Sequence, residues 1–281
     1  MRFGFKTSPQ NTTWADLLAV WRAADAIDFY DSGWTFDHFY PIFSDSTGPC
    51  MEGWLTTTAL AQATERLRVG VLVTGMPYRH PAVLANMAST LDIVSNGRLD
   101  VGVGAGWNVE EATAYGIDLH DSLTDRFDAF DEGCEAIIGL LSSETTTLDG
   151  RFVRLTDARC EPKPVQRPHP PICIGGGGER RTLRSAARFA QHWNFPGGDA
   201  ATFARKRDVL HGHCADLGRD PSEILVSMHL RLPPDGDVGA LAQQAEEFAG
   251  AGLQLGIIYL PPPHTPAVLE PVAAALEHLR A

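Results

Sequence analysis

The chain has 281 residues, of which 44% are hydrophobic and 21% charged, and this composition is that of a folded protein rather than a disordered one. Its formal net charge of −12 disfavours nucleic acid as a partner, because a protein needs a basic surface to neutralise phosphates. No apolar run approaches the roughly 20 residues of a membrane span, so we expect no membrane association. Five cysteines without a CxxC pair favour reduced thiols in a cytoplasmic protein and argue against a disulfide framework or a metal site.

Short β-prone segments alternate with longer helical stretches from one end of the chain to the other. Apolar residues at 3.6-residue spacing predict a helix from Pro81 onward, and the pair Asn96-Gly97 predicts its end. A second long amphipathic helix is expected over 123–141. The expected strands, in chain order, are 2–5, 33–39, 67–74, 99–103, 172–174, 192–195, 224–229 and 255–260.

One part of the chain breaks this alternation. Two β-prone arms flank Asp149-Gly150, which predicts a hairpin over 144–156, and five prolines between 162 and 171 exclude a helix there. No linker or change in composition divides the chain. Eight strand–helix units therefore predict one α/β domain over 1–281, a (β/α)8 TIM barrel with an insertion over about 112–165 between strands 4 and 5.

Barrel enzymes carry their active-site residues at the carboxyl ends of the strands, and three strand ends here are unusual in composition. Asp37 and His38 leave the second strand together, and an imidazole there could donate or accept a proton near neutral pH. A histidine satisfied by the backbone is the alternative. Alternating glycines over 102–106 would permit the close approach of a flat ligand. The spacing of Asn108 and Glu111 predicts a helix N-cap and the acid that returns to it.

A third strand end, over 174–184, combines four consecutive glycines and a helix start with Arg180, Arg181 and Arg184. Backbone amides in such a loop, at the positive end of a helix dipole, bind phosphate readily. The segment 151–188 has a net charge of +6 while the rest of the chain has −18, which favours a small anion in this region. A solvated basic face and a tight β-to-α connection are the alternatives.

Several long stretches of the sequence resemble the luciferase-like monooxygenase family. Within it, the sequence is most similar to the oxidoreductases that use coenzyme F420, an 8-hydroxy-5-deazaflavin. The resemblance implies a (β/α)8 barrel with an insertion, and a hydride transfer between the deazaflavin and an organic substrate. The matching segments, between Arg2 and about Ile224, are 73–85, 91–99, 102–107, 161–166, Asp37-His38-Phe39 and the Gly175–Gly178 loop.

The resemblance also implies a cofactor site in the barrel mouth. His38 would be the catalytic residue, as a proton donor or as a group that stabilises the deprotonated ring. A non-proline cis peptide is implied near Val71–Leu72, beside the cofactor ring. The cofactor-binding residues that the resemblance implies are Asp37, Val71, Leu72, Thr74, Ala105, Gly106, Gly176, Gly177 and Gly178.

This sequence departs from one branch of the family. The sugar-phosphate dehydrogenases have a tryptophan and a glutamate where Ile42 and Trp107 stand here, so we expect glucose 6-phosphate not to be a substrate. Trp107, together with Phe39, Tyr40 and Ile42, instead favours a pocket for a flatter and more apolar small molecule. A Trp107 that only packs under a loop is the alternative.

Two other functions stay open at this point. One is an FMN-dependent luciferase-like monooxygenase, and the other is a cofactor-binding protein without useful turnover, in which Asp37 and His38 only hold the ligand. The positive segment 151–188 favours the deazaflavin, because its phosphate and oligoglutamate tail are more anionic than FMN. The identity of the substrate, the direction of hydride transfer and a homodimeric assembly are also left open.

Overall fold

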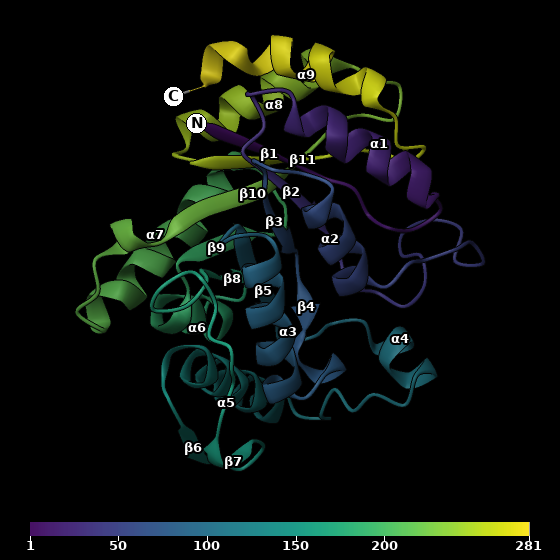
Figure 1. The fold of residues 1–281 in the computed structure, drawn as a ribbon. Coiled ribbons are helices and arrows are strands. Elements are labelled where there is room, and N and C mark those ends of the chain that lie inside the picture. Colours follow the sequence, from purple (N-terminus) through teal and green to yellow (C-terminus); the bar gives the residue numbers. More distant parts are fainter. Residues whose placement is uncertain (281) are drawn as a thin grey trace.

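The strands that the sequence predicts all form, and they pair side by side in parallel. The computed structural model describes residues 1–280. The eighth strand of the series returns to the first, where Tyr259 lies opposite Lys6, and the third pairs with the fourth, so the sheet is closed. The prediction of a (β/α)8 barrel is therefore confirmed (Figure 1). The barrel strands are β1 (Arg2–Lys6), β2 (Ser32–Thr35), β3 (Arg68–Val71), β5 (Leu99–Gly104), β8 (Ile172–Gly175), β9 (His192–Phe195), β10 (Leu225–Arg231) and β11 (Leu255–Tyr259).

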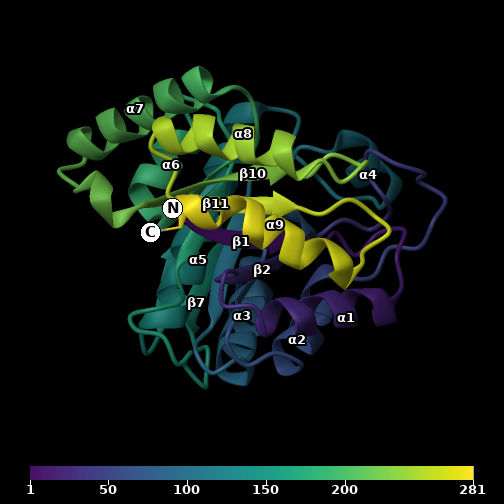
Figure 2. The same cartoon turned by 90° about the horizontal axis from the view of Figure 1, so that it is seen from above.

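One helix follows each barrel strand, and together they form an outer layer around the strands (Figures 1 and 2). Residues close in the sequence determine where these helices begin and end. The Thr13 side chain accepts a hydrogen bond from the Asp16 amide and caps the N-terminus of α1. After α3, Asn96 and Gly97 have positive φ angles of 56° and 79°, which end the helix. The end expected from Asn96-Gly97 is confirmed. These helices are α1 (Trp14–Asp25), α2 (Gly53–Gln62), α3 (Pro81–Val94), α5 (Leu123–Ser142), α6 (Thr182–Phe189), α7 (Ala200–Asp216), α8 (Val238–Gly250) and α9 (Leu269–Leu276).

The segment between β5 and β8 carries the insertion, in the expected place between the fourth and fifth barrel strands. It adds a short helix, α4 (Val109–Ala114), which stands apart from the helical layer in Figure 1. It also adds an antiparallel hairpin of β6 (Thr146–Asp149) and β7 (Arg154–Ala158), as expected from Asp149-Gly150. Short 3-10 turns complete the fold at Met76–Tyr78, Pro221–Glu223, Pro266–Val268 and Glu277–Leu279.

The third barrel strand is interrupted at the mouth. After β3 the chain bulges, and a two-residue strand, β4 (Thr74–Gly75), resumes the pairing with β5. The peptide bond between Leu72 and Val73 is cis, so the expected non-proline cis bond is confirmed one residue beyond its expected position.

Two glycines of β5 make room for this bulge. A Cβ atom on Gly102 would lie 1.9 Å from the Val71 carbonyl oxygen, and one on Gly104 would lie 3.0 Å from a Val73 methyl group. Both glycines therefore accommodate the protein's own chain, which corrects the expectation that they leave space for a flat ligand.

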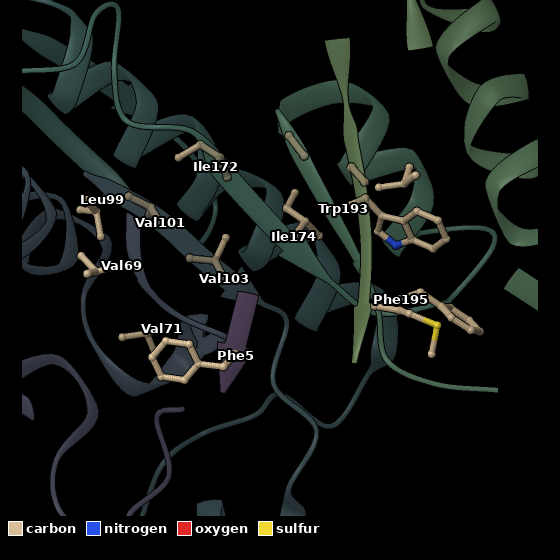
Figure 3. Close-up of a cluster of buried hydrophobic side chains, with 14 of the residues drawn as sticks. Phe5, Val69, Val71, Leu99, Val101, Val103, Ile172, Ile174, Trp193 and Phe195 are labelled. Carbon is tan, nitrogen blue, oxygen red and sulfur yellow. The ribbon is translucent and has the colours of Figure 1, made fainter. Parts of the chain in front are cut away.

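The core has two layers that follow the alternation of the strands. Outward-facing side chains such as Val69, Val101 and Ile174 are fully buried beneath the helices (Figure 3). Each such burial contributes about 1.5–3 kcal/mol to stability. Inside the barrel, a second cluster surrounds Trp34, whose indole N–H donates to Ser32 Oγ at 2.9 Å. The filled interior leaves the carboxyl ends of the strands as the place for a site.

None of the helices over residues 1–280 is long and apolar enough to cross a membrane. In the same range, all five cysteines have free thiols.

Candidate active site

His38 lies at the carboxyl end of β2, three residues beyond Thr35, and a carboxylate holds it in place. Its Nδ1 is 2.7 Å from Glu111 Oε2, in the first turn of α4. The other oxygen of Glu111 accepts the Phe39 amide at 2.6 Å, and the Tyr78 hydroxyl donates to Oε2 at 2.6 Å. Because a carboxylate only accepts, His38 Nδ1 carries the proton in this pair. His38 Nε2 is thus the ring nitrogen left for a ligand.

Glu111 is completely buried, and its surroundings keep it ionised. Burial alone would raise the pKa of Glu111, but hydrogen bonds from His38, Tyr78 and the Phe39 amide outweigh burial and lower it. The Asn108 side chain accepts from the Glu111 amide at 3.2 Å, so the predicted N-cap is confirmed. The expectation that the Glu111 carboxylate returns to the cap is wrong, because three donors compete for it at the end of β2.

Asp37 is bound from within the protein. Arg79 grips both of its oxygens, with Nη2 3.0 Å from Oδ1, and reaches Glu52 with the same guanidinium. Burial raises the pKa of Asp37, although Arg79 opposes this shift. Thr74 also opposes the shift in the pKa of Asp37, and its hydroxyl accepts the Trp54 indole N–H at 2.7 Å. The predicted residues Asp37 and Thr74 are therefore neighbours, at the ends of β2 and β4.

Aromatic rings line the mouth beside His38. Trp107 has 55% of its surface exposed, its ring centre is 5.8 Å from that of His38, and it stacks on Phe43 at 5.7 Å. Phe39 packs on Tyr115 at 4.7 Å between ring centres. The exposure of Trp107 contradicts the alternative that it only packs under a loop. Phe43, 87% exposed, belongs to the same aromatic group and was not predicted from the sequence, because no motif marks it.

The other residues expected at the barrel mouth lie beside these aromatic rings or at the ends of the third and fourth barrel strands. Tyr40 stacks on Tyr115 at 6.3 Å, and the Ile42 backbone is held on both sides by the Gln10 amide. Of the residues expected at the cofactor ring, Val71 and Leu72 are buried at the bulge of the third strand, and Ala105 and Gly106 follow β5.

The glycine loop after β8 is shaped by the start of α6. A Cβ atom on Gly176 would lie 2.8 Å from Thr182 Cγ2, and one on Gly178 would lie 2.9 Å from Thr182 Oγ1. Gly176 also has a φ of 130°, a conformation that side chains disfavour. The residue before α6, Arg181, makes no side-chain cap. The loop therefore ends at a helix terminus whose amides no side chain caps.

Two of the four arginines of this loop and α6 form ion pairs with carboxylates of α5. Arg181 binds Asp128 at 2.5 Å on α5, and Arg188 binds Glu135 on the same helix. Arg180 and Arg184 are exposed and form no ion pair within residues 1–280. The sequence predicted that Arg180, Arg181 and Arg184 are all available to bind an anion. In the structure only Arg180 and Arg184 are available, because Arg181 is paired with Asp128.

A cationic cluster on the opposite side of the mouth was not predicted. Lys6, at the end of β1, is buried, and its Nζ donates to the Leu72 carbonyl at 2.8 Å. Burial, and then the charge of Arg231, lower the pKa of Lys6 to about 7. The one indication of this cluster in the sequence is a lysine directly after the β-prone residues Phe3 and Phe5.

Comparison with known proteins decides the family. The model of the luciferase-like monooxygenase family matches residues 1–251. The chain belongs to the luciferase-like monooxygenase family. The resemblance noted in the sequence is thereby confirmed, and it places the chain in a family of oxidoreductases.

Relatives within this family use different cofactors. An uncharacterized protein of Mycobacterium tuberculosis is 32% identical over 192 residues, which are 66% of this chain and 64% of that protein, a little under two thirds of its length. An F420-dependent glucose-6-phosphate dehydrogenase of Microbacterium testaceum is 30% identical over 243 residues, 84% of this chain and 70% of the relative. An FMNH2-dependent dimethylsulfone monooxygenase of Pseudomonas putida is 31% identical over 169 residues, 57% of this chain and 45% of the relative.

Solved structures show the same fold over the whole chain. An F420-dependent secondary alcohol dehydrogenase in complex with an F420–acetone adduct superposes with a TM-score of 0.88, covering 100% of this chain and 99% of that one, at 19% identity. At 19% identity this similarity establishes the barrel fold. It does not identify the cofactor of this chain.

Proposed function

We propose that this protein is a coenzyme F420-dependent oxidoreductase that transfers a hydride between the deazaflavin and a small organic substrate. The observation that carries the proposal is the His38–Glu111 pair. A buried carboxylate fixes the protonated nitrogen of His38 and leaves Nε2 free at the end of a barrel strand. Such an arrangement serves a group that moves a proton.

The residues of the mouth fit the cofactor. Gly176, Gly177 and Gly178, with the uncapped start of α6, would hold its phosphate. Leu72, Val71 and Thr74 at the bulge, with Ala105 and Gly106 opposite, would lie along its ring. The bound deazaflavin would supply the hydride chemistry, while the protein supplies binding, orientation and electrostatics.

His38 acts on the proton that accompanies the hydride. In substrate oxidation, His38 Nε2 would accept the hydroxyl proton of a substrate whose carbon gives its hydride to the bound deazaflavin. Glu111 stabilises the imidazolium that forms, because its negative charge is 2.7 Å from Nδ1 and shielded from water. In reduction the same proton returns from Nε2 to the substrate oxygen. Trp107 and Phe43 would form the wall on which a flat substrate lies.

An FMN-dependent monooxygenase is the second candidate, and the flavin-dependent relative from Pseudomonas putida supports it. The deazaflavin is favoured by Arg180 and Arg184, two exposed guanidinium groups beside the glycine loop that have no carboxylate partner among residues 1–280. FMN has a single phosphate, whereas the oligoglutamate tail offers these arginines further anions. A protein that only holds its cofactor is disfavoured, since such a protein gains nothing from a buried glutamate on His38.

A titration of the purified protein with both cofactors tests the proposal. We expect F420 to quench protein fluorescence at lower concentration than FMN, and added salt to weaken F420 binding. Replacement of both loop arginines, in an R180Q/R184Q variant, should weaken F420 binding more than FMN binding. The matched control is R154Q, which removes an exposed arginine on the hairpin. Equal or tighter FMN binding by the wild-type protein overturns the proposal.

A further inference from the structure

The amine of Lys6 is buried without a counter-ion. The residue has 6% of its surface exposed, and its one hydrogen-bond acceptor is the Leu72 carbonyl, 2.8 Å away. Within residues 1–280, no carboxylate forms an ion pair with it. Lysines are rarely buried unless they are paired, because removing the charge from water is costly.

A second cation without a partner lies beside it. Arg231 ends β10 opposite Tyr259, and its guanidinium carbon is 5.4 Å from the centre of the Tyr259 ring. Lys6 Nζ is 5.7 Å from the same ring. Arg231 also forms no ion pair in the part of the chain that the structure describes. Two cations thus share one aromatic ring, in a protein whose net charge is −12.

Two neutral groups complete the cluster. His229, two residues before Arg231 on β10, has a buried Nε2 with no hydrogen-bond partner within residues 1–280. Burial, and then the charges of Lys6 and Arg231, lower the pKa of His229, so its ring is neutral. The Tyr259 hydroxyl is paired with Ser8 Oγ at 2.9 Å. The cluster therefore offers positive charge and a free imidazole nitrogen, and it lacks a carboxylate.

We propose that Lys6, Arg231 and His229 form a subsite that binds a carboxylate of the substrate. This rests on the proposed function in taking the barrel mouth as the reaction site. The carboxylate supplies the missing negative charge, and its two oxygens match two separate cations. The substrate class is thus an organic acid.

The position of the subsite assigns it to the substrate rather than to the cofactor phosphate. In the closed order of strands, Lys6 on β1 lies across the barrel from β8, which carries the glycine loop. Arg231 and His229 lie on β10, which β9 separates from β8, so the three residues of the subsite extend from β10 to the side opposite the glycine loop. His38, by contrast, follows β2, the immediate neighbour of β1. Adjacent strands are about 4.8 Å apart, so a small acid held by Lys6 presents its reacting carbon near His38.

Benzoate and benzamide are the probes for this subsite, because they share shape and size and differ in charge. We expect the purified protein without cofactor, at about pH 6 where Lys6 is protonated, to bind benzoate at least roughly tenfold more tightly than benzamide, as measured by ligand-observed NMR titration. The K6M and R231M variants should each lose most of that preference while benzamide binding stays unchanged. Arg231 is exposed, so R231M keeps the fold, which the unfolding midpoint checks. R154M, on the hairpin, is the matched control.

Equal binding of benzoate and benzamide, or an unchanged preference in both variants, overturns the subsite. Loss of the preference in R180Q/R184Q instead would assign benzoate to the glycine loop and also overturn it. Since the titration uses no cofactor, its outcome is independent of whether F420 binds. If the protein binds FMN but not F420 and still prefers benzoate to benzamide, the proposed function is wrong and the subsite is supported.

Discussion

The two sides of the barrel mouth carry positive charge in opposite ways. On the β8 side, arginines are numerous in the sequence, but Arg181 and Arg188 are tied to carboxylates of α5. At the ends of β1 and β10, by contrast, neither Lys6 nor Arg231 has a carboxylate partner within residues 1–280. Net charge along a segment therefore says little about the charge that a ligand meets. What counts is which cations the fold leaves unpaired.

His38 follows β2, next to β1, and its removal should have the largest effect. An H38A variant should lose turnover by roughly two or more powers of ten, as is usual for general acid–base groups. Cofactor affinity should change much less, because the glycine loop lies on another strand end. Steady-state kinetics and a cofactor titration separate the two quantities. Near wild-type turnover would make His38 a structural residue.

Glu111 acts on the reaction through His38, so its effect should be smaller. E111Q keeps a hydrogen-bond acceptor but removes the charge that stabilises the imidazolium, and we expect kcat to fall roughly tenfold to a hundredfold. The value of KM should change much less, because Glu111 is buried behind His38 and bonds to its ring. E110Q, the adjacent exposed glutamate, is the control. A lower stability with an unchanged kcat would contradict the positioning role.

The pH dependence of the free energy of unfolding tests whether Lys6 is unpaired. The pKa of Lys6 is about 7 in the folded protein and near 10.4 in an unfolded chain, so between these values the unfolded state binds one more proton. The free energy of unfolding should therefore rise with pH, by about 1.4 kcal/mol per pH unit, relative to a K6M variant. Denaturant unfolding between about pH 8 and pH 10 measures this. Parallel curves for the two proteins would mean that Lys6 is paired.

Arg181 should behave as a structural residue on the other side. R181M should lower the free energy of unfolding by about 0.5 kcal/mol, because it removes a partly exposed ion pair with Asp128. It should leave F420 affinity unchanged, unlike R180Q/R184Q. An F420 affinity that falls as much in R181M as in R180Q/R184Q would show that Arg181 leaves its carboxylates to bind the cofactor.

Glucose 6-phosphate should give no turnover, which is the smallest signal expected. Trp107 has an indole N–H and no carboxylate, and the nearby Glu111 is buried behind His38. Loss of the visible absorption of oxidised F420 on mixing with the sugar phosphate measures the reaction. Efficient bleaching would mean that another carboxylate reaches the sugar.

The barrel could be predicted because its signals are local. Strand alternation, the helix from Pro81 and the stop at Asn96-Gly97 each depend on residues close together in the chain. The wall residue Trp107 and the histidine followed from strand-end composition and family resemblance. These features needed no knowledge of how distant segments meet.

The features that were missed depend on distant contacts. Glu111 meets His38 across 73 residues, so its N-cap spacing with Asn108 indicated the wrong partner. The glycine pattern around Gly102 suggested room for a ligand. In the structure, the group that approaches Gly102 closely is the Val71 carbonyl of a neighbouring strand. The Lys6 cluster needed the closure of the barrel, which brings the first strand beside the last.

A crossed titration tests the division of the mouth most directly. Oxidised F420 and benzoate are each titrated into the R180Q/R184Q and R231M proteins, and the four affinities are compared with those of the wild type. We predict that R180Q/R184Q weakens F420 binding and leaves benzoate unchanged, and that R231M does the reverse. Variants that each weaken both ligands to the same extent would contradict two separate anion sites in one barrel mouth.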